Sequence, residues 1–526
     1  MAVTANSLAS AVTAGAKNEQ FGVQANVLQR KILAIGTYDP AKTSVTPLVE
    51  QVIFSPEDAG SRYGFGTMLH KLIEKIYSVS PGVPVFALPQ EEAVGASEAT
   101  GNILFAGTAT ANGTVHIYFG GDKVGTGIAV NTGDTAAEVA TAVNAAINAA
   151  SEIPVSSAVN GTTPEQLDFT AKSAGTWGND ISIEFNLEAD EELPAGITTT
   201  ITDMSGGATN PDMSAALDAL GTGDAQNESH YTDIVHGYGQ DSTVLDAIST
   251  YNGVGDTKTG NYSELVARPF RSLVGDVAAG SAGYSDLITL ADGRRLDRTT
   301  GVMAVPGSPT HPAYIASIAV SLGARVNNNL AEESLGGPVG TLLPGVYAGA
   351  RADRWSDDYD NRDAAYKNGI GTTRIKNDAV YISDVVTFYR PVDVSPTTNA
   401  YRSYRNISIL QNILDAIKSN FEREKWQGFS VVANTDKVSD TESNRKARDA
   451  GAVIDDYIAL AYAFEGRAWI YSADFSIEEL KKSGSVTIRP DGRGFDSVFR
   501  FIPSGEGGIL DNEAVFDAAL TVALGG

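Results

Sequence analysis

The fold class is decided near the N-terminus by the stretch Val27-Leu28-Gln29-Arg30-Lys31-Ile32-Leu33-Ala34-Ile35-Gly36. Its apolar second half, ended by a glycine, predicts a buried strand. Residues 55–77 follow, with apolar side chains at helical spacing: Met68, Leu69, Leu72, Ile73 and Ile76. Residues 84–88 form a second apolar run, which Pro89 closes. A strand, a helix and another strand in this order indicate an α/β unit.

Residues 101–203 have a different character. Apolar and polar residues alternate on both sides of Asn112-Gly113, which predicts a β-hairpin because both turn residues tolerate positive φ. Thr135 and Glu138 predict a capping box at the start of a short helix. The segment contains thirteen acidic and two basic residues, a net charge of −11 out of −26 for the chain. We expect a mostly β insert that is exposed to solvent.

The remaining segments complete the predicted organisation. Residues 204–350 return to an α/β pattern and include a helix that starts at Pro312. Further on, the pattern predicts long helices over 399–426 and 440–464, and strands over 379–389, 486–488 and 498–501. The fold class is therefore α+β and multidomain. An α/β core (21–100 and 204–350) is interrupted by the insert (101–203) and followed by an α/β C-terminal domain (351–512).

Both ends of the chain are predicted to be arms. Near the C-terminus every second residue is apolar, a one-faced strand pattern formed by Phe516, Ala518, Leu520, Val522 and Leu524. A strand at a chain end must pair with its own domain or with another chain, because an open edge is a template for pairing. The expected arms are residues 1–20, rich in Ala, Ser, Thr and Val, and residues 513–526. Two such arms are typical of an assembly subunit.

Composition excludes several classes of protein. The 526 residues include no cysteine, which excludes disulfides, a thiolate nucleophile and cysteine-based metal sites. A net charge of −26 argues against direct nucleic-acid binding, which needs a basic surface. No run of 18 apolar residues predicts a membrane span, and no basic residue before Lys17 supports a signal peptide. The simplest expectation is a soluble protein folded in a cytoplasm.

The search for reactive sites returns no strong candidate. The sequence has no P-loop and no Gly-x-Ser-x-Gly nucleophile motif. Its five histidines are scattered, and the pair His230 and His236 is more simply explained by core or loop positions than by metal binding. The acidic runs 357–360 and 190–192 are best interpreted as solvated loops. No catalytic residue, cofactor or metal ligand is predicted.

Basic residues concentrate in one part of the C-terminal half. Residues 402–448 include nine basic and six acidic residues, so the local net charge is +3. A solvated helix face with ion pairs explains this as well as a docking face for an acidic partner does. The candidates for the docking face are Arg402, Arg405, Arg423, Lys425, Arg445, Lys446 and Arg448.

The order of these segments resembles the contractile tail sheath proteins of bacteriophages, in particular the branch typified by phage Mu. The resemblance rests on residues 29–36 and on four further motifs. These are Tyr63-Gly64-Phe65-Gly66-Thr67-Met68-Leu69-His70, Pro84-Val85-Phe86-Ala87-Leu88-Pro89, Gly175-Thr176-Trp177-Gly178-Asn179-Asp180-Ile181 and Phe499-Arg500-Phe501-Ile502-Pro503. Each motif is weak alone, and their order across most of the chain makes the resemblance specific.

The resemblance implies a structural subunit without enzymatic activity. Subunits of this kind polymerise helically around a tail tube on a baseplate, and contraction drives the tube through the host envelope during genome ejection. The implied partners are other copies of the chain, the tail tube protein, and the baseplate and tail terminator proteins. The implied location is the virion, after assembly in the host cytoplasm. The insert would face outward, the C-terminal domain would lie near the tube, and the arms would pair with neighbouring subunits.

Two other classes of function remain open at this point. A secreted or surface-exposed adhesin-like protein would suit the acidic, Thr- and Gly-rich insert, although the missing signal peptide speaks against it. A nucleotide-binding α/β enzyme would suit a strand that ends at Gly36. The sequence has no Gly-x-Gly-x-x-Gly motif to support that reading.

Overall fold

The computed structural model describes residues 27–391, 401–435, 438 and 446–507. The chain forms two compact units. Unit 1 comprises Met1–Asn26 and Ser419–Ile502, and unit 2 comprises Val27–Lys418 and Pro503–Gly526. Both the predicted arm strand, with Phe516 to Leu524, and residues 1–20 lie outside the described residues.

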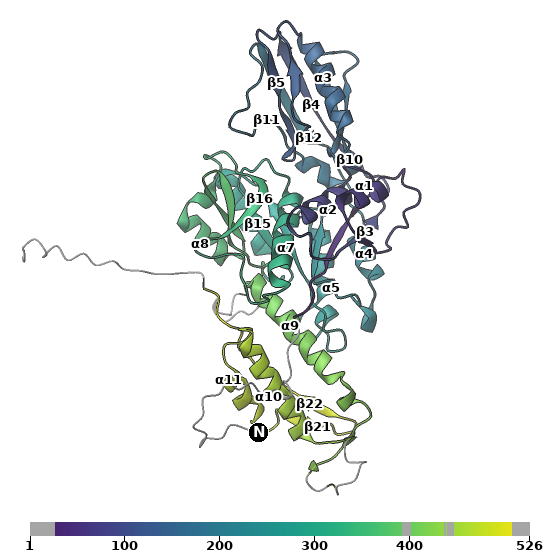
Figure 1. The fold of residues 1–526 in the computed structure, drawn as a ribbon, viewed down its shortest axis with the longest axis vertical. Helices are drawn as coiled ribbons and strands as arrows, with labels where there is room; N and C mark the ends of the chain where they lie inside the picture. The colour runs from purple at the N-terminus through teal and green to yellow at the C-terminus, as the bar shows by residue number, and fades with distance from the viewer. Residues whose placement is uncertain (1–26, 392–400, 436–437, 439–445, 508–526) are drawn as a thin grey trace, which may run out of the picture. The chain divides into compact units, whose positions relative to one another are not determined.

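Unit 2 is built on a six-stranded sheet (Figure 1). The strand order is β15 (Thr300–Ala304), β14 (Arg271–Asp276), β13 (Asp233–His236), β1 (Ile32–Thr37), β3 (Val85–Gln90) and β2 (Gln51–Ile53). All neighbours pair in parallel except β2, which runs antiparallel to β3. Every residue of β1 is buried, as the apolar run from Ile32 predicts.

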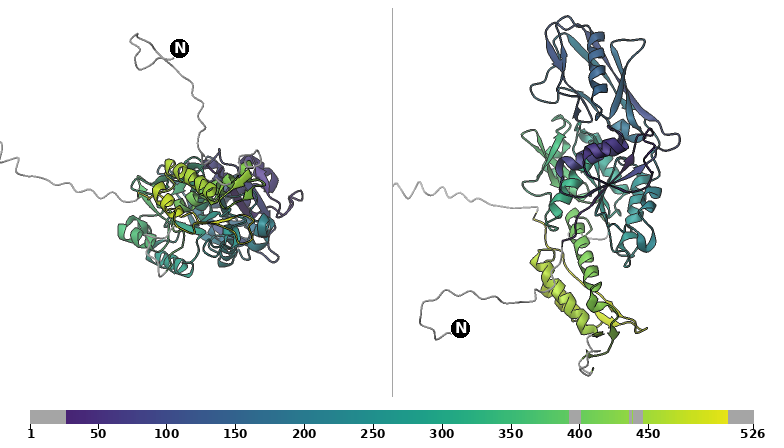
Figure 2. Two further views of the ribbon diagram at one scale, coloured as in Figure 1. Left: turned by 90° about the horizontal axis from the view of Figure 1, so that it is seen from below. Right: turned by 45° about the vertical axis from the view of Figure 1, so that its right-hand side comes forward.

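Helices cover both faces of this sheet. On one face α2 (Met68–Val79) packs against α7 (Pro312–Asn327), and α1 (Pro56–Tyr63) packs against α2. Right-handed crossovers place α5 (Ser242–Asn252) and α6 (Gly280–Gly293) on the other face, where α4 (Met213–Ala219) packs against α5. Figure 2 shows these helices around the central strands. The helix predicted from Pro312 is confirmed, with the proline in its first turn.

The segment between β3 and α4 forms the insert. Its four-stranded antiparallel sheet is ordered β12 (Ile197–Ser205), β4 (Glu98–Gly107), β10 (Gln166–Ala174) and β9 (Val155–Val159). Helix α3 (Ala136–Ala149) packs on this sheet, and its Thr135–Glu138 capping box is confirmed. The smaller elements are β5 (Gly113–Val115), β6 (Ile117–Phe119), β7 (Asp122–Lys123), β8 (Ile128–Val130), η1 (Thr176–Asp180) and β11 (Ile183–Phe185).

The hairpin predicted at Asn112-Gly113 is wrong. Strand β4 pairs with β10 and β12, whereas β5 pairs with β8. Long-range contacts determine this path. The Asn112 side chain accepts hydrogen bonds from the amide and the hydroxyl of Thr132, and the Thr110 amide donates to Ala195 O at 2.7 Å.

The rest of unit 2 follows α7. A three-stranded antiparallel sheet is ordered β16 (Thr341–Tyr347), β18 (Ala379–Asp384) and β17 (Thr372–Lys376), next to η4 (Trp355–Asp357) and α8 (Tyr359–Lys367). The strand predicted over 379–389 therefore ends at Asp384. The long helix predicted over 399–426 is α9 (Tyr404–Phe421), and a separate 3₁₀ turn, η6 (Glu424–Trp426), follows it.

Unit 1 is a small α+β structure. It contains α10 (Ala450–Gly466), α11 (Ala473–Leu480), the parallel pair β19 (Ser430–Val431) and β20 (Ala447–Arg448), and the antiparallel pair β21 (Val486–Ile488) and β22 (Phe495–Ser497). The helix predicted over 440–464 begins only at Ala450, because Asp449 caps it and β20 precedes it. The strand predicted over 498–501 is displaced to β22.

Candidate assembly surfaces

The crevice in which a parallel α/β sheet would hold a ligand is filled. In such sheets ligands bind beyond the carboxyl ends of the strands, where the strand order reverses, here between β1 and β13. A Cβ built on Gly36 would lie 3.1 Å from Met68 Sδ, and one on Gly237 would lie 2.5 Å from the same side chain and 3.3 Å from Trp177 Cδ1. Met68 and Trp177 are both fully buried. Side chains of α2 and of the insert thus occupy this crevice.

The N-terminus of α2 is satisfied within the chain. A helix N-terminus beside such a crevice is the position that binds phosphate in nucleotide-binding folds. Here the Met68 amide donates to Ser173 Oγ of the insert at 3.0 Å, and the Gly66 amide donates to His70 Nδ1 at 3.0 Å. The structure thus gives the nucleotide-binding interpretation no support at this position.

The insert is fastened to the core by buried polar groups. Asp122 in β7 forms ion pairs with Lys71 (Nζ to Oδ2, 2.8 Å) and Lys75 of α2. Burial alone would raise the pKa of Asp122, but the two ammonium groups outweigh it and lower the pKa. His311 bridges the same junction. Its Nδ1 accepts from the Ala313 amide at 3.1 Å, and its Nε2 lies 3.0 Å from Trp177 O, so the neutral ring with the proton on Nε2 satisfies both.

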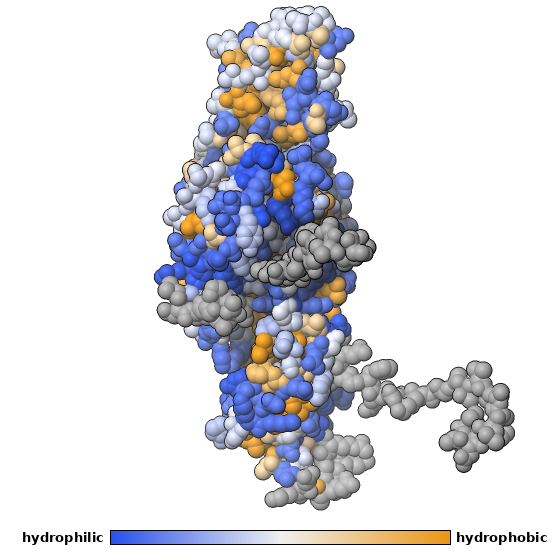
Figure 3. Space-filling view, turned by 90° about the vertical axis from the view of Figure 1, so that its left-hand side faces the viewer, coloured by the Kyte–Doolittle hydropathy of each residue, from blue (hydrophilic) through white to orange (hydrophobic). Residues whose placement is uncertain are grey.

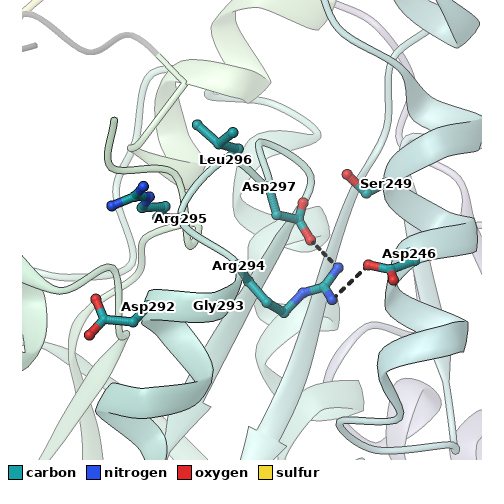
Figure 4. A pocket seen from close by; sticks show the side chains of 8 residues that line it. All are labelled: Asp246, Ser249, Asp292, Gly293, Arg294, Arg295, Leu296 and Asp297. Atoms are coloured by element: carbon teal, nitrogen blue, oxygen red, sulfur yellow. Dashed lines mark hydrogen bonds and ion pairs between the residues drawn. The ribbon is translucent and has the colours of Figure 1, made fainter. Parts of the chain in front are cut away.

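A concave region of about 400 Å³ lies at the end of α6 (Figure 4). Arg294 points to Asp246 of α5 (2.9 Å) and to the buried Asp297 (3.1 Å), while Arg295 and Leu296 point away from these carboxylates. Asp297 also accepts hydrogen bonds from the amides of Thr299 and Thr300. These contacts show a brace between α5, α6 and the turn before β15. None of these contacts pairs a nucleophilic side chain with a general base.

One residue of each acidic run in the sequence has a structural role. Asp358 accepts hydrogen bonds from the amides of Asp360 and Asn361 as the N-cap of α8. Glu191 was expected in a solvated run, but it is buried and accepts hydrogen bonds from Tyr118 Oη (2.8 Å) and from Lys123. No group of three or more metal-ligating side chains occurs in the described part of the chain. Among those residues no helix is long and apolar enough to cross a bilayer.

The basic candidates belong to both units. Arg402 and Arg405 are only 5% and 6% exposed, within unit 2. The Arg402 guanidinium donates to Tyr366 O, and that of Arg405 donates to Glu332 O and Ser504 O. Nothing in the sequence pattern revealed this burial, since both lie among polar neighbours before the apolar stripe of α9.

The other candidates belong to unit 1, except that Arg445 lies outside the described residues. Arg423, Lys425 and Lys446 are exposed and Arg448 is half-buried. Lys425 and Arg448 lie over the Trp426 ring, 5.7 and 6.0 Å from its centroid, and Arg448 Nη2 donates to Lys425 O at 3.0 Å. We call Lys425, Lys446 and Arg448 the basic group of unit 1.

Sequence reasoning missed the node that organises unit 1. Asp456 of α10 is 7% exposed and accepts hydrogen bonds from Asn420 Nδ2 (3.0 Å) and Trp426 Nε1 (2.8 Å), besides its ion pair with Lys425. Stacked rings extend the core beside it, with Tyr457 and Phe499 5.2 Å apart. The sequence signal for this buried carboxylate was an aspartate among the apolar residues of a predicted helix.

Exposed apolar side chains occur in both units. The most exposed include Phe54 and Val339 in unit 2 and Tyr471 in unit 1. On the face shown in Figure 3, apolar residues gather in small separate patches on a mostly hydrophilic surface. In unit 1, β21 and β22 pair only with each other among the described residues. A two-stranded sheet of this kind has outer edges that can accept another strand.

Comparison with known proteins identifies a relative. No protein family model matches the chain. The Mu-like prophage FluMu tail sheath protein of Haemophilus influenzae is 28% identical over 370 residues, which cover 70% of this chain and 69% of that protein. Ribonuclease Y of Fusobacterium nucleatum is 24% identical over 160 residues, and because these are only 28% of this chain and 32% of that enzyme, the match assigns no function.

Solved structures of sheath proteins also align with the chain. The sheath tail protein of Desulfitobacterium hafniense aligns with 94% of this chain and 98% of its own length, at 11% identity and a TM-score of 0.42. The PVC sheath complex of an extracellular contractile injection system, in the contracted state, aligns with 98% of this chain and 100% of its own length, at 6% identity and a TM-score of 0.44. At these scores the structural likeness decides nothing. The sequence comparison does confirm the resemblance to the phage Mu branch: over 70% of its length this mixed α/β chain is similar to a Mu-like prophage tail sheath protein.

Proposed function

We propose that the chain is the structural subunit of a contractile phage tail sheath. Its copies would polymerise helically around a tail tube, and contraction of the polymer would drive the tube through the host envelope during genome ejection. The observation that carries this proposal is the similarity over 370 residues to a curated tail sheath protein. The proposed location is the virion, after assembly in the host cytoplasm. A structural role without catalysis is consistent with the filled crevice between β1 and β13.

Net charge is distributed unevenly along the chain, and this distribution supports a polymer. Residues 419–502 contain twelve basic and fourteen acidic residues, a net charge of −2, whereas the whole chain carries −26. Copies of a strongly acidic surface repel one another, so a part that packs against many neighbours should be nearly neutral. We infer that residues 419–502 form the contacts within the polymer and with the tube, and that the acidic insert faces outward.

Two features of unit 1 support these contacts. The edges of the β21–β22 pair could accept the terminal strand, with Phe516 to Leu524, from a neighbouring subunit by β-augmentation. The basic group of unit 1 could meet acidic groups on the tube. Individual exposed ion pairs contribute only about 0–1 kcal/mol, so many of them along a tube could hold a sheath extended and still separate together. The proposed further partners are baseplate and tail terminator proteins.

Immunogold electron microscopy tests the proposal on whole particles. Antibodies raised against residues 101–203 are applied to tailed particles released from the host culture. The proposal predicts gold along the full length of extended tails and along a shorter, wider sheath after contraction. Label confined to tail tips, or found on cell surfaces without tails, would contradict it and favour an adhesin-like protein.

A further inference from the structure

The described residues at both ends of unit 2, 27–30 and 503–507, contact the same helix, α9. At the N-terminal side the Leu28 amide donates to Asn412 Oδ1 at 2.8 Å. The fully buried Arg30 donates through its guanidinium to Gln411 Oε1 and to Ser408 Oγ. Residues 27–30 are therefore held along the second and third turns of α9 before the chain continues into β1.

The C-terminal side is held one turn earlier on α9. Arg405 Nη1 donates to Ser504 O at 2.8 Å, and its Nη2 donates to Ser504 Oγ at 2.6 Å. Ser403 Oγ donates to Glu506 Oε2 at 2.8 Å, and Ser334 Oγ donates to the other carboxylate oxygen. Residues 503–507 are thus fixed through contacts to Ser504 and Glu506.

Helix α9 is itself anchored in the core of unit 2. Tyr404 Oη donates to the buried Asp233 at 3.2 Å, and Arg271 Nη1 donates to Tyr404 O at 3.1 Å. Gln411 Nε2 donates to Thr232 O (2.9 Å) and Pro269 O (3.0 Å). These contacts join α9 to the start of β13 and to β14. A force on either terminal part would therefore reach the central sheet through α9.

We propose that Arg405 is a positioning residue that fixes residues 503–507, and that α9 serves as the common anchor for the described residues at both ends of unit 2, 27–30 and 503–507. This inference rests on the proposed function, in which the terminal arms pair with other copies of this chain. When the residues from which an arm starts are fixed, the arm loses less conformational entropy on binding a neighbour. The anchor also transmits tension between neighbours to the folded core. The role replaces the contact with the tube that the sequence suggested for Arg405.

Site-specific labelling can test the anchor on the full chain. Because the chain has no cysteine, a single cysteine at Gly507 takes a nitroxide label at one place, and no atom lies within 4 Å of a Cβ at this position. In the Arg405→Ala variant we expect loss of the immobilised component of the electron paramagnetic resonance spectrum, together with loss of long polymers. The matched control is Arg362→Ala, which removes a guanidinium that donates to Ser356 O and Asp357 O elsewhere in unit 2.

A second variant keeps the test possible if the Arg405→Ala variant does not fold. Ser504→Ala combined with Glu506→Ala removes acceptors on residues 503–507 and leaves α9 intact, and we expect the same two losses. An unchanged spectrum in these variants would overturn the anchor, whatever the protein assembles into. Normal polymers from variants with a mobile label would overturn its role in assembly. A parent protein with an immobilised label that never polymerises would instead contradict the proposed sheath function.

Discussion

At the scale of single residues, buried charges bind the insert to the core. Lys71 is almost inaccessible, with 2% of its side chain exposed, and it reaches both Asp122 and Glu74. Lys75 joins the same carboxylates and lies 5.0 Å from the centre of the Tyr314 ring on α7. The insert is therefore attached to the core through a cluster in which each charged group is paired with groups of opposite charge.

The Asp122→Asn variant tests this cluster. It leaves Lys71 and Lys75 with Glu74 but without Asp122, and breaking a buried pair on one side costs about 3 kcal/mol or more. We expect the free energy of unfolding to fall by about that amount in urea denaturation. Asp363→Asn, which removes a partner of the exposed Lys367 within α8, should change little. Equal effects of the two substitutions would show that the cluster at Asp122 is not stabilising.

Four histidines with lowered pKa values predict sensitivity to acid. Burial lowers the pKa of His70, His236 and His311 to about 4 and that of His230 to about 3, against an ordinary value of about 6.5. The unfolded chain therefore binds more protons between pH 6.5 and about 4, and stability present above pH 6.5 is lost as the pH falls.

Six carboxyls oppose this trend, because desolvation raises the pKa of each of them: Glu98, Asp180, Glu184, Asp276, Asp297 and Asp384. Desolvation, and then the charge of Asp276, raise the pKa of Asp180 to about 6, so this group favours the folded state as the pH falls. We expect the four histidines to outweigh these carboxyls. We expect the midpoint of thermal unfolding to decrease from pH 7 to pH 5. A constant or rising midpoint over this range would contradict the prediction.

At the scale of elements, unit 1 depends on the carboxylate that joins the end of α9 and η6 to α10. Asp456 is the acceptor for Asn420, Trp426 and Lys425. Buried donors that lose an acceptor cost about 1–3 kcal/mol each, so this position should matter more than any exposed ion pair.

The Asp456→Ala variant should loosen unit 1 selectively. We expect a loss of about 3 kcal/mol in that unit, seen as faster hydrogen–deuterium exchange in residues 419–502 with little change in residues 27–418. The adjacent Asp455, which is exposed on the same helix, gives the matched control Asp455→Ala. If both variants exchange alike, the node at Asp456 does not hold unit 1 together.

Elements with strong local sequence patterns were predicted correctly, whereas features that depend on long-range contacts were not. The strand at Ile32 and the capping box at Thr135 combine pattern with specific end residues, and both are confirmed. The helical region predicted over 55–77 is divided into α1 and α2. The hairpin at Asn112 failed because contacts to residues 132 and 195, distant in sequence, determine that path. Burial of Arg405 and Glu191 depends on partners brought together only by folding. No local pattern could show it.

At the scale of the whole molecule, charge and termini bear on assembly. The nearly neutral segment 419–502 contrasts with the acidic remainder, and the described residues at both ends of unit 2 are anchored on α9. Both observations fit a subunit that is joined to its neighbours through residues 419–502 and through its ends.

Removal of residues 513–526 tests the terminal strand. We expect the shortened protein to remain folded, with an unchanged circular dichroism spectrum, because the described core does not include these residues. Sedimentation should show only small species, since the strand with Phe516 to Leu524 would no longer join neighbouring subunits. Polymers of normal length would show that this strand pairs within its own subunit.

The central claim is that copies of this chain assemble into a sheath, and negative-stain electron microscopy of the concentrated, purified protein tests it most directly. The account predicts hollow tubes or stacked rings with a regular helical repeat, and a lumen wide enough to hold a tail tube. Discrete monomers at every concentration and salt condition would contradict it.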